Sequence, residues 1–545
     1  MIEPEHPASS LLIVEIRERA ITGVLSDVVA GRHRLVAAWR EWTAQGERSM
    51  AAAFDRMVME IERIVGRRLM DSSGLIRPEM ADGQGCDAII VTAGPPLRIA
   101  SIPLSRTAVE AVLGAAEPAV WFSDSIYPLD SLLDQQGGLV TTLASVLRDR
   151  RPDVLLLAGD DDSATAAGDL LSLAAAIAAA GQLCRDPLPL VVAAMSPALR
   201  SRFVAALDQA AQRMLAPGAL RIREGELAGL RTCLRDVWQE RLTEQFPFAA
   251  TGRPSPVPAP WLEGLGRAAH ILSAWSEAPV WIADVEGELA VVVRAIGDDV
   301  ALSLGCRHDL ESLSVRTAGP GGAAERDRRP WLIQDDAAGI TAERDALIRL
   351  LASAAAGIPP MGKRDQQPGL IVGRGFDLIA RLPTEVAASA IGLGLGLTGA
   401  CTVALDRHYL LAGAGALLDI QPDAAADLLY DALDPLGGVM IVRAARPPED
   451  RTARLRIDTA HGETIEVGWE EPVVLSGDAW ERRDLRLTPP RRVDLGNGEG
   501  KRVDLALEGG ELGLVVAAGD RSTARRWARS SGLQVRVGSV VRRGP

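Results

Sequence analysis

Three adjacent carboxylates offer the first chemistry that this sequence suggests. Asp160, Asp161 and Asp162 follow an apolar run that ends in Gly159, and ligands of open α/β sheets gather beyond the carboxyl ends of strands. Carboxylates of this kind can hold Mg²⁺ through water. They can equally form a solvated loop that caps the helix expected from about Thr165, and we favour this second interpretation.

The segment GLGLTG at 394–399 has the glycine spacing of a dinucleotide-binding turn. Such a turn must follow a strand and open a helix, with an acid about 20 residues further on. Here the glycines follow a helix-like stretch at 384–391 and precede a strand-like stretch at 402–406, and Asp406 comes too early to be that acid. We therefore expect a helix-to-strand turn without a cofactor.

Other catalytic patterns are missing from the sequence. The six histidines have no metal-ligand spacing, G-x-S-x-G does not occur, and Lys363 and Lys501 are the only lysines that a phosphate site has available. We expect no metal centre and no catalytic residue from these patterns. The five cysteines lie far apart with no C-x-x-C pair, so we expect reduced thiols.

The elements that must position any site have an α/β rhythm. Residues 10–42 contain three strand-like runs parted by breaks too short for a helical crossover, which predicts an antiparallel meander. Residues 50–70 then have apolar side chains at helical spacing. Strand-like runs at 87–94, 120–124 and 152–160 alternate with helical stretches, as in a mostly parallel sheet.

A second α/β half follows the proline-rich stretch at 246–260, with strands expected at 280–287, 288–296 and 370–373. From about 450 short strands alone follow, which is typical of a small β-sandwich or barrel. We predict a first lobe with an inserted α/β subdomain at 1–250, a second lobe at 260–445 and a C-terminal β domain at 450–545.

Composition excludes several classes of protein. With 545 residues, 47% hydrophobic and 24% charged, the chain can bury several cores and is not a disordered protein. Its formal charge of −13 repels a phosphate backbone, so we expect no nucleic-acid partner. The start lacks a signal peptide and the apolar run at 170–180 is too short to cross a bilayer, which predicts a cytoplasmic protein without a membrane partner.

The last 25 residues are electrostatically distinct, because they hold seven arginines and no acid. Arg521, Arg525, Arg526 and Arg529 could bind an acidic protein partner. A solvated terminus is the alternative, and it is the interpretation we favour.

A series of motifs carries a family resemblance. These are VEIRERAIT at 14–22, VTAGPPLRI at 91–99, PDVLLLAGDDDSA at 152–164, IADVEGELAV at 282–291, LIVGRGFDL at 370–378 and a closing β segment at 487–516. In this order the series resembles glutamate mutase L, the MutL-type accessory protein of coenzyme B12-dependent glutamate mutase, over nearly the whole chain. The resemblance implies an α/β fold of the actin, sugar-kinase and heat-shock chaperone ATPase superfamily: two actin-like (ribonuclease H-like) lobes around a nucleotide cleft, plus a C-terminal all-β domain.

The resemblance also implies where that cleft was built. The matching positions are Glu15, Thr22, Gly94, Asp284, Gly287, Gly373 and Gly375. The first phosphate turn departs from the family, since Arg17 replaces its glycine, Glu18 and Arg19 replace small hydroxyl residues and Thr22 replaces its lysine. Backbone N–H groups can approach phosphates there only without a Cβ in the way. At the second turn Glu286 replaces a glycine, and the hydroxyls and second acid are gone.

Damage at both phosphate turns predicts a pseudo-ATPase with a vestigial site and no cofactor. We expect an accessory or scaffold protein that works through protein contacts, with an active paralogue or a mutase subunit as its partner; the oligomeric state stays open. The alternative is an active Mg·ATP-dependent ATPase or kinase with a rebuilt phosphate site. There, Mg²⁺ would be held by Glu15, Asp284 and Asp160 or Asp161, and phosphate by Arg17 or Arg19. A filament or pilus-assembly scaffold is a third hypothesis without a motif in its favour.

Overall fold

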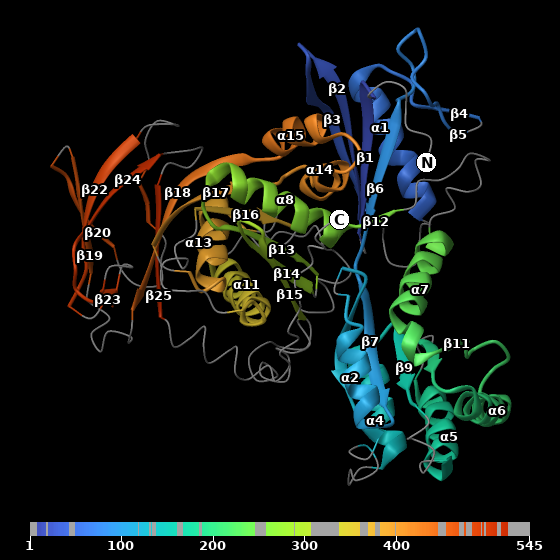
Figure 1. The fold of residues 1–545 in the computed structure, drawn as a ribbon. Coiled ribbons are helices and arrows are strands. Elements are labelled where there is room, and N and C mark those ends of the chain that lie inside the picture. The colour runs from blue at the N-terminus through green and yellow to red at the C-terminus, as the bar shows by residue number, and fades with distance from the viewer. Residues whose placement is uncertain are drawn as a thin grey trace. The chain divides into compact units, whose positions relative to one another are not determined.

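The computed structural model describes most of the chain. The described residues are 8–17, 20–42, 50–72, 74–117, 119–129, 132, 138–160, 167–184, 188–245, 258–287, 289–306, 337–359, 369–375, 382–397, 399–444, 454–460, 462–467, 473–475, 482–491, 493–494, 498–508 and 514–520. They form two compact units, one from residues 1–93 and 247–545 and one from 94–246 (Figure 1). Among the helices described, none combines the length and apolar composition that a bilayer-spanning helix needs.

The first unit begins with a lobe built on a five-stranded sheet. Its elements are β1 (Ser10–Ile16), β2 (Ala20–Val29), β3 (Arg32–Trp42), α1 (Met50–Val65), the short pair β4 (Met70–Asp71) and β5 (Gly74–Leu75), β6 (Ala88–Ala93), β12 (Ala259–Pro260) and α8 (Trp261–Ser276). The sheet order is β3-β2-β1-β6-β12, in which β1, β2 and β3 are antiparallel and β6 and β12 run parallel to β1. The predicted meander and its following helix are confirmed. The apolar face of α1 packs on the meander, where Met57 occupies the space beside Gly23.

A second lobe in the same unit repeats this topology. Its elements are β13 (Val280–Glu286), β14 (Leu289–Ile296), β15 (Asp299–Cys306), α11 (Ala337–Ala356), β16 (Leu370–Arg374), α13 (Thr384–Gly394), β17 (Gly399–Leu405), α14 (Leu411–Leu417), α15 (Pro422–Asp431) and β18 (Asp434–Ala444). The order β15-β14-β13-β16-β17 has the same three antiparallel and two parallel strands as the first lobe. The two lobes are therefore structural duplicates. The glycines at 394–399 lie between α13 and β17, as the predicted helix-to-strand turn requires.

From residue 454 onward, the regular elements of the described residues are strands, as predicted. They are β19 (Leu455–Thr459), β20 (Thr464–Val467), β21 (Val473–Leu475), β22 (Arg482–Thr488), β23 (Val493–Asp494), β24 (Val503–Glu508) and β25 (Leu514–Asp520). Four of them form the antiparallel sheet β20-β19-β22-β24. The others extend the second lobe's sheet, since β25 pairs with β18 and β21 while β23 also pairs with β18. The boundaries at 250, 260, 445 and 450 stay predictions.

The second unit is a parallel sheet with helices between its strands, which confirms the βα rhythm. Its elements are β7 (Leu97–Pro103), α2 (Arg106–Gly114), β8 (Trp121–Ile126), α4 (Leu139–Ser145), the π-helical turn η1 (Val146–Arg150), β9 (Val154–Ala158), α5 (Ala167–Leu183), β10 (Leu190–Ala194), α6 (Pro197–Met214), β11 (Ile222–Gly225), the 3₁₀ turn η3 (Leu227–Gly229) and α7 (Leu230–Gln245). The strand order is β11-β10-β9-β7-β8, with every pairing parallel. Leu155, Leu157, Leu173, Ile177 and Phe203 are among its core residues.

Helices α8 and α14, which follow the fifth strands of the two lobes, are in close contact. A Cβ added at Gly264 of α8 would lie 2.1 Å from the carbonyl oxygen of Ala412 in α14. A Cβ at Gly415 would lie 1.9 Å from the carbonyl oxygen of Gly264. Glycine at these positions therefore lets the two backbones touch, and the lobes pack through them.

Candidate functional site

Strand register places the candidate residues in two matching rows, one in each lobe. Residues opposite each other in a ladder point to the same face of a sheet. The first-lobe row is Arg40, Thr22, Glu15, Thr92 and Ala259. The second-lobe row is Leu304, Val291, Asp284 and Arg374, continued by Asp406 directly after β17. Glu15 and Asp284 are thus equivalent positions in the duplicated sheets.

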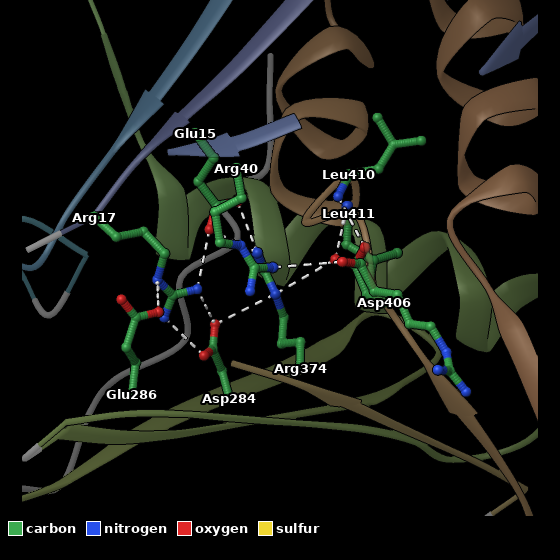
Figure 2. A network of polar contacts seen from close by, with 10 residues as sticks. Glu15, Arg17, Arg40, Asp284, Glu286, Arg374, Asp406, Leu410 and Leu411 are labelled. Atoms are coloured by element: carbon green, nitrogen blue, oxygen red, sulfur yellow. Dashed lines mark hydrogen bonds and ion pairs between the residues drawn. The ribbon is translucent and has the colours of Figure 1, made fainter. Parts of the chain in front are cut away.

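Arg17 joins the two rows, two residues beyond Glu15. Its Nη1 donates to Glu15 Oε1 at 3.0 Å and to Asp284 Oδ2 at 2.9 Å, and its Nη2 donates to Asp284 Oδ1 at 2.7 Å. Its Nε lies 2.6 Å from Glu286 Oε2 (Figure 2). All three guanidinium nitrogens therefore face carboxylates, and only 6% of the residue is exposed. Glu286 occupies in the second lobe the position that Arg17 has in the first.

Arg374 is the second cation of this cluster. It extends from the end of β16, and its Nη2 donates to both carboxylate oxygens of Glu15 at 2.7 Å. Its Nε lies 3.3 Å from Asp284 Oδ2 and 3.4 Å from Asp406 Oδ2. The residue is completely buried. We call Glu15, Arg17, Asp284, Glu286, Arg374 and Asp406 the charged cluster.

Aromatic rings and backbone N–H groups complete the surroundings of the charged cluster. The guanidinium carbon of Arg17 lies 4.3 Å from the Trp261 ring centroid, and that of Arg40 lies 3.8 Å from the Tyr409 centroid, at distances that give cation–π attraction. Asp406 accepts hydrogen bonds from the N–H groups of Leu410 and Leu411 at 2.8 and 3.1 Å. The aromatic rings therefore contact the planar faces of the Arg17 and Arg40 guanidinium groups. The backbone N–H groups stabilise the charge of the Asp406 carboxylate.

Burial and charge oppose each other in this cluster. Burial alone lowers the pKa of the Arg17 guanidinium, but Asp284, Glu286 and Glu15 together raise it well above its ordinary value. Burial also lowers the pKa of the Arg374 guanidinium, but the nearby carboxylates, mainly Glu15 and Asp284, raise it above its ordinary value. Burial raises the pKa of Asp406, against the opposing effect of Arg374. Both arginines are therefore permanent cations inside the protein.

The predicted glycines lie around the cluster, with one exception. Gly287 forms the turn after β13 with φ of +64°, and Gly375 follows Arg374 with φ of +95°. A Cβ at Gly375 would lie 2.2 Å from the Val285 carbonyl oxygen and 2.7 Å from Asp284 Oδ1. A Cβ at Gly373 would lie 2.6 Å from the Ile391 side chain of α13 and 2.9 Å from the Leu405 side chain of β17. Gly94 is the exception, because it is the first residue of the second unit.

The predicted aspartate cluster and the predicted arginine-rich tail are described only in part or not at all. Asp160 accepts a hydrogen bond from Ser105 Oγ at 3.3 Å after β9, while Asp161 and Asp162 lie outside the described residues. Within the described ranges no group of three or more His, Cys, Asp or Glu residues is arranged to hold a metal ion. Arg521, Arg525, Arg526 and Arg529 also lie outside the described residues, as do Glu18 and Arg19.

Some hydroxyls beside the cluster lack a protein partner. Thr22 and Thr92 flank Glu15 in its row and are buried, yet neither Oγ1 has a hydrogen-bond partner among the described residues. The same holds for the hydroxyl of buried Tyr409, whose φ is +58°. Buried groups of this kind are commonly satisfied by ordered water.

Comparisons with known proteins found similarity among solved structures alone. No family model and no curated protein matches the chain. Among solved structures it is similar to the Ppx/GppA family member of Aquifex aeolicus, at 10% identity over 67% of this chain and 66% of that one, with a TM-score of 0.19. It is also similar to xylulose kinase from Rhodospirillum rubrum, at 12% identity over 78% and 93% of the two chains, with a TM-score of 0.29.

A third similar structure is the PilM–PilN type IV pilus biogenesis complex, at 12% identity over 77% of this chain and 98% of that one, with a TM-score of 0.24. The chain spans slightly less than two thirds of the Aquifex protein's length. It has two actin-like lobes. That statement rests on the duplicated strand order, and it confirms the predicted fold class. No activity of these proteins is transferred to the chain, because the TM-scores are low.

The sequence reasoning found part of the charged cluster. It singled out Glu15, Arg17, Asp284 and Glu286, each from a departure or match at a phosphate turn. It missed Arg374, although an arginine that ends the apolar run LIVG is a signal in itself: a charge in a buried strand needs a counter-charge. It also dismissed Asp406, whose partner only the fold brings near, and it did not consider Trp261 or Tyr409.

Proposed function

We propose that this protein is a pseudo-ATPase that works as a scaffold through protein contacts. The observation that carries the proposal is the position of Arg17. Its guanidinium lies between Glu15 and Asp284, the two carboxylates that the family resemblance assigns to the nucleotide site, and bonds to both. The chain's own cation therefore takes the place of an external one.

A bound Mg·nucleotide would have to disrupt this arrangement. In nucleotide sites Mg²⁺ is commonly held by one or two carboxylates together with substrate phosphates and water. The carboxylates of Glu15 and Asp284 already accept hydrogen bonds from Arg17 and Arg374. Phosphate would need guanidinium donors, but the nitrogens of Arg17 already face carboxylates. Moving Arg17 would leave buried charges uncompensated, at a cost of about 3–5 kcal/mol. The residues present do not fit Mg·ATP.

The finer assignment, an accessory protein like glutamate mutase L, rests on the ordered motif series alone. Under this proposal the partner is an active paralogue or a mutase subunit, and no cofactor is required. The alternative of an active ATPase with a rebuilt phosphate site needs Arg17 or Arg19 free to clamp phosphate. The bonds of Arg17 to three carboxylates weigh against it.

Isothermal titration with Mg·ATP tests the proposal. We expect no heat of binding at millimolar nucleotide and no release of phosphate above a protein-free control. Stoichiometric binding at micromolar nucleotide would overturn the proposal. If such binding were lost in an Asp284→Ala variant and kept in an Asp298→Ala variant, whose side chain lies in the exposed β14–β15 turn, the active-enzyme alternative would be supported.

A further inference from the structure

A second contact joins the two lobes away from the charged cluster. Strand β3 is the edge of the first-lobe sheet, and helix α15 of the second lobe lies along it. The N–H of His33 donates to Asp427 Oδ2 at 2.9 Å, and the N–H of Leu35 donates to Asp431 Oδ2 at 3.0 Å. Two helix carboxylates thus take the place of a neighbouring strand.

The spacing of the two elements makes this possible. Asp427 and Asp431 are one helical turn apart, which is a rise of about 6 Å. His33 and Leu35 are two strand residues apart, which is about 6.7 Å, and alternate N–H groups of a strand point to the same edge. The spacing of the two carboxylates along α15 therefore matches the spacing of the two edge N–H groups along β3. A β-bulge at Val36, the unpaired residue between Leu35 and Ala37, ends the matched stretch.

Further polar contacts between the two lobes reinforce this one. Arg34 Nη1 lies 2.6 Å from Asp431 Oδ1. Gln421, at the start of α15, donates through its Nε2 to the Ala8 carbonyl oxygen at 3.0 Å and to His33 Nε2 at 3.1 Å. His33 Nε2 is therefore an acceptor, which leaves its Nδ1 to donate to Ser26 Oγ at 3.4 Å. Because Gln421 Nε2 can only donate, this contact favours the neutral form of His33.

We propose that β3 and α15 form a clasp that holds the two lobes in one arrangement without a bound nucleotide. We call His33, Leu35, Asp427 and Asp431 the clasp. The inference rests on the proposed function, because lobes that bind no nucleotide need another element to fix their spacing. The clasp supplies it from the outer edge of the sheet, while the charged cluster acts between the sheet faces. Lobe opening is set by these contacts together with the packing of α8 against α14.

The test compares an Asp427→Ala/Asp431→Ala variant with wild type. Asp423→Ala is the matched control, since Asp423 lies on the same helix but is exposed. Spin labels introduced as non-canonical amino acids at Met59 of α1 and Asp298 of the β14–β15 turn, both exposed, report the distance between the lobes. Hydrogen exchange at the His33 and Leu35 amides reports the clasp itself.

We expect the double variant to broaden the distance distribution and shift it to longer values. We also expect exchange of the two amides to accelerate by roughly tenfold or more, because each loses a hydrogen bond to a charged acceptor. The control should match wild type in both measurements. Faster exchange with an unchanged distance distribution would overturn the clasp. A separate result, Mg·ATP narrowing the distribution of the double variant, would instead contradict the pseudo-ATPase proposal.

Discussion

Replacing Arg17 by methionine tests whether the charged cluster is an internal lock. Methionine keeps an unbranched apolar stem, so the change removes chiefly the cation. The Arg17→Met variant loses two hydrogen bonds to Asp284, one hydrogen bond to Glu15 and the ion pair with Glu286. Breaking a buried pair by removing one partner costs about 3–5 kcal/mol. We expect the free energy of opening of β1 to fall by that amount.

Native-state hydrogen exchange measures this quantity without treating the chain as two-state. The amides of β1 are paired with β2 and β6 and should exchange roughly two to four orders of magnitude faster in Arg17→Met. Arg63→Met is the control, because Arg63 forms an exposed pair with Glu60 on α1 and such pairs contribute little. A change no larger than that of the control would refute the lock.

Two other predictions concern contacts between the lobes. Gly415→Ala should destabilise the first unit by about 1–3 kcal/mol or more, because its Cβ would meet the Gly264 carbonyl oxygen at 1.9 Å; calorimetry should show little effect of Gly114→Ala, where the added Cβ meets nothing within 4 Å. Burial lowers the pKa of His33 below its ordinary value of 6.5 by more than the neighbouring carboxylates raise it. The folded chain therefore binds fewer protons at His33 than the unfolded chain does. The clasp should lose stability as the pH falls through 6.5. Exchange of the clasp amides, corrected for intrinsic pH effects, should accelerate from pH 7.5 to 5.5 in wild type, and His270→Gln should leave this dependence unchanged.

Much of the fold could be predicted because period-2 and helical patterns are local. The meander at 10–42 and the strand at 370–373 were read from such patterns, and both are present. Pairing between distant strands was harder to foresee. Nothing local in the closing strands distinguishes β24, which joins a separate sheet, from β25, which pairs with β18, because sheet membership depends on long-range register.

The site was predictable only as far as each residue could be judged alone. Glu15 and Asp284 stood out by their match to family motifs, whereas Arg374 was hidden between two retained glycines. Its role depends on the parallel pairing that sets it opposite Asp284 and on a contact across 359 residues with Glu15. The charges of such a cluster are visible in the sequence, but their pairing is not.

Duplication explains why Arg17 and Glu286 belong together. Arg17 and Glu286 occupy the same step in the two lobes, two residues after Glu15 and Asp284, and the fold brings them within 2.6 Å. Arg17 alone would still have Glu15 and Asp284 as counter-charges. Glu286 alone would add a third carboxylate beside those two, without the cation that compensates it. The charges therefore act as one unit: Arg17 compensates the buried charge of Glu286, and the pair forms a contact between the two lobes.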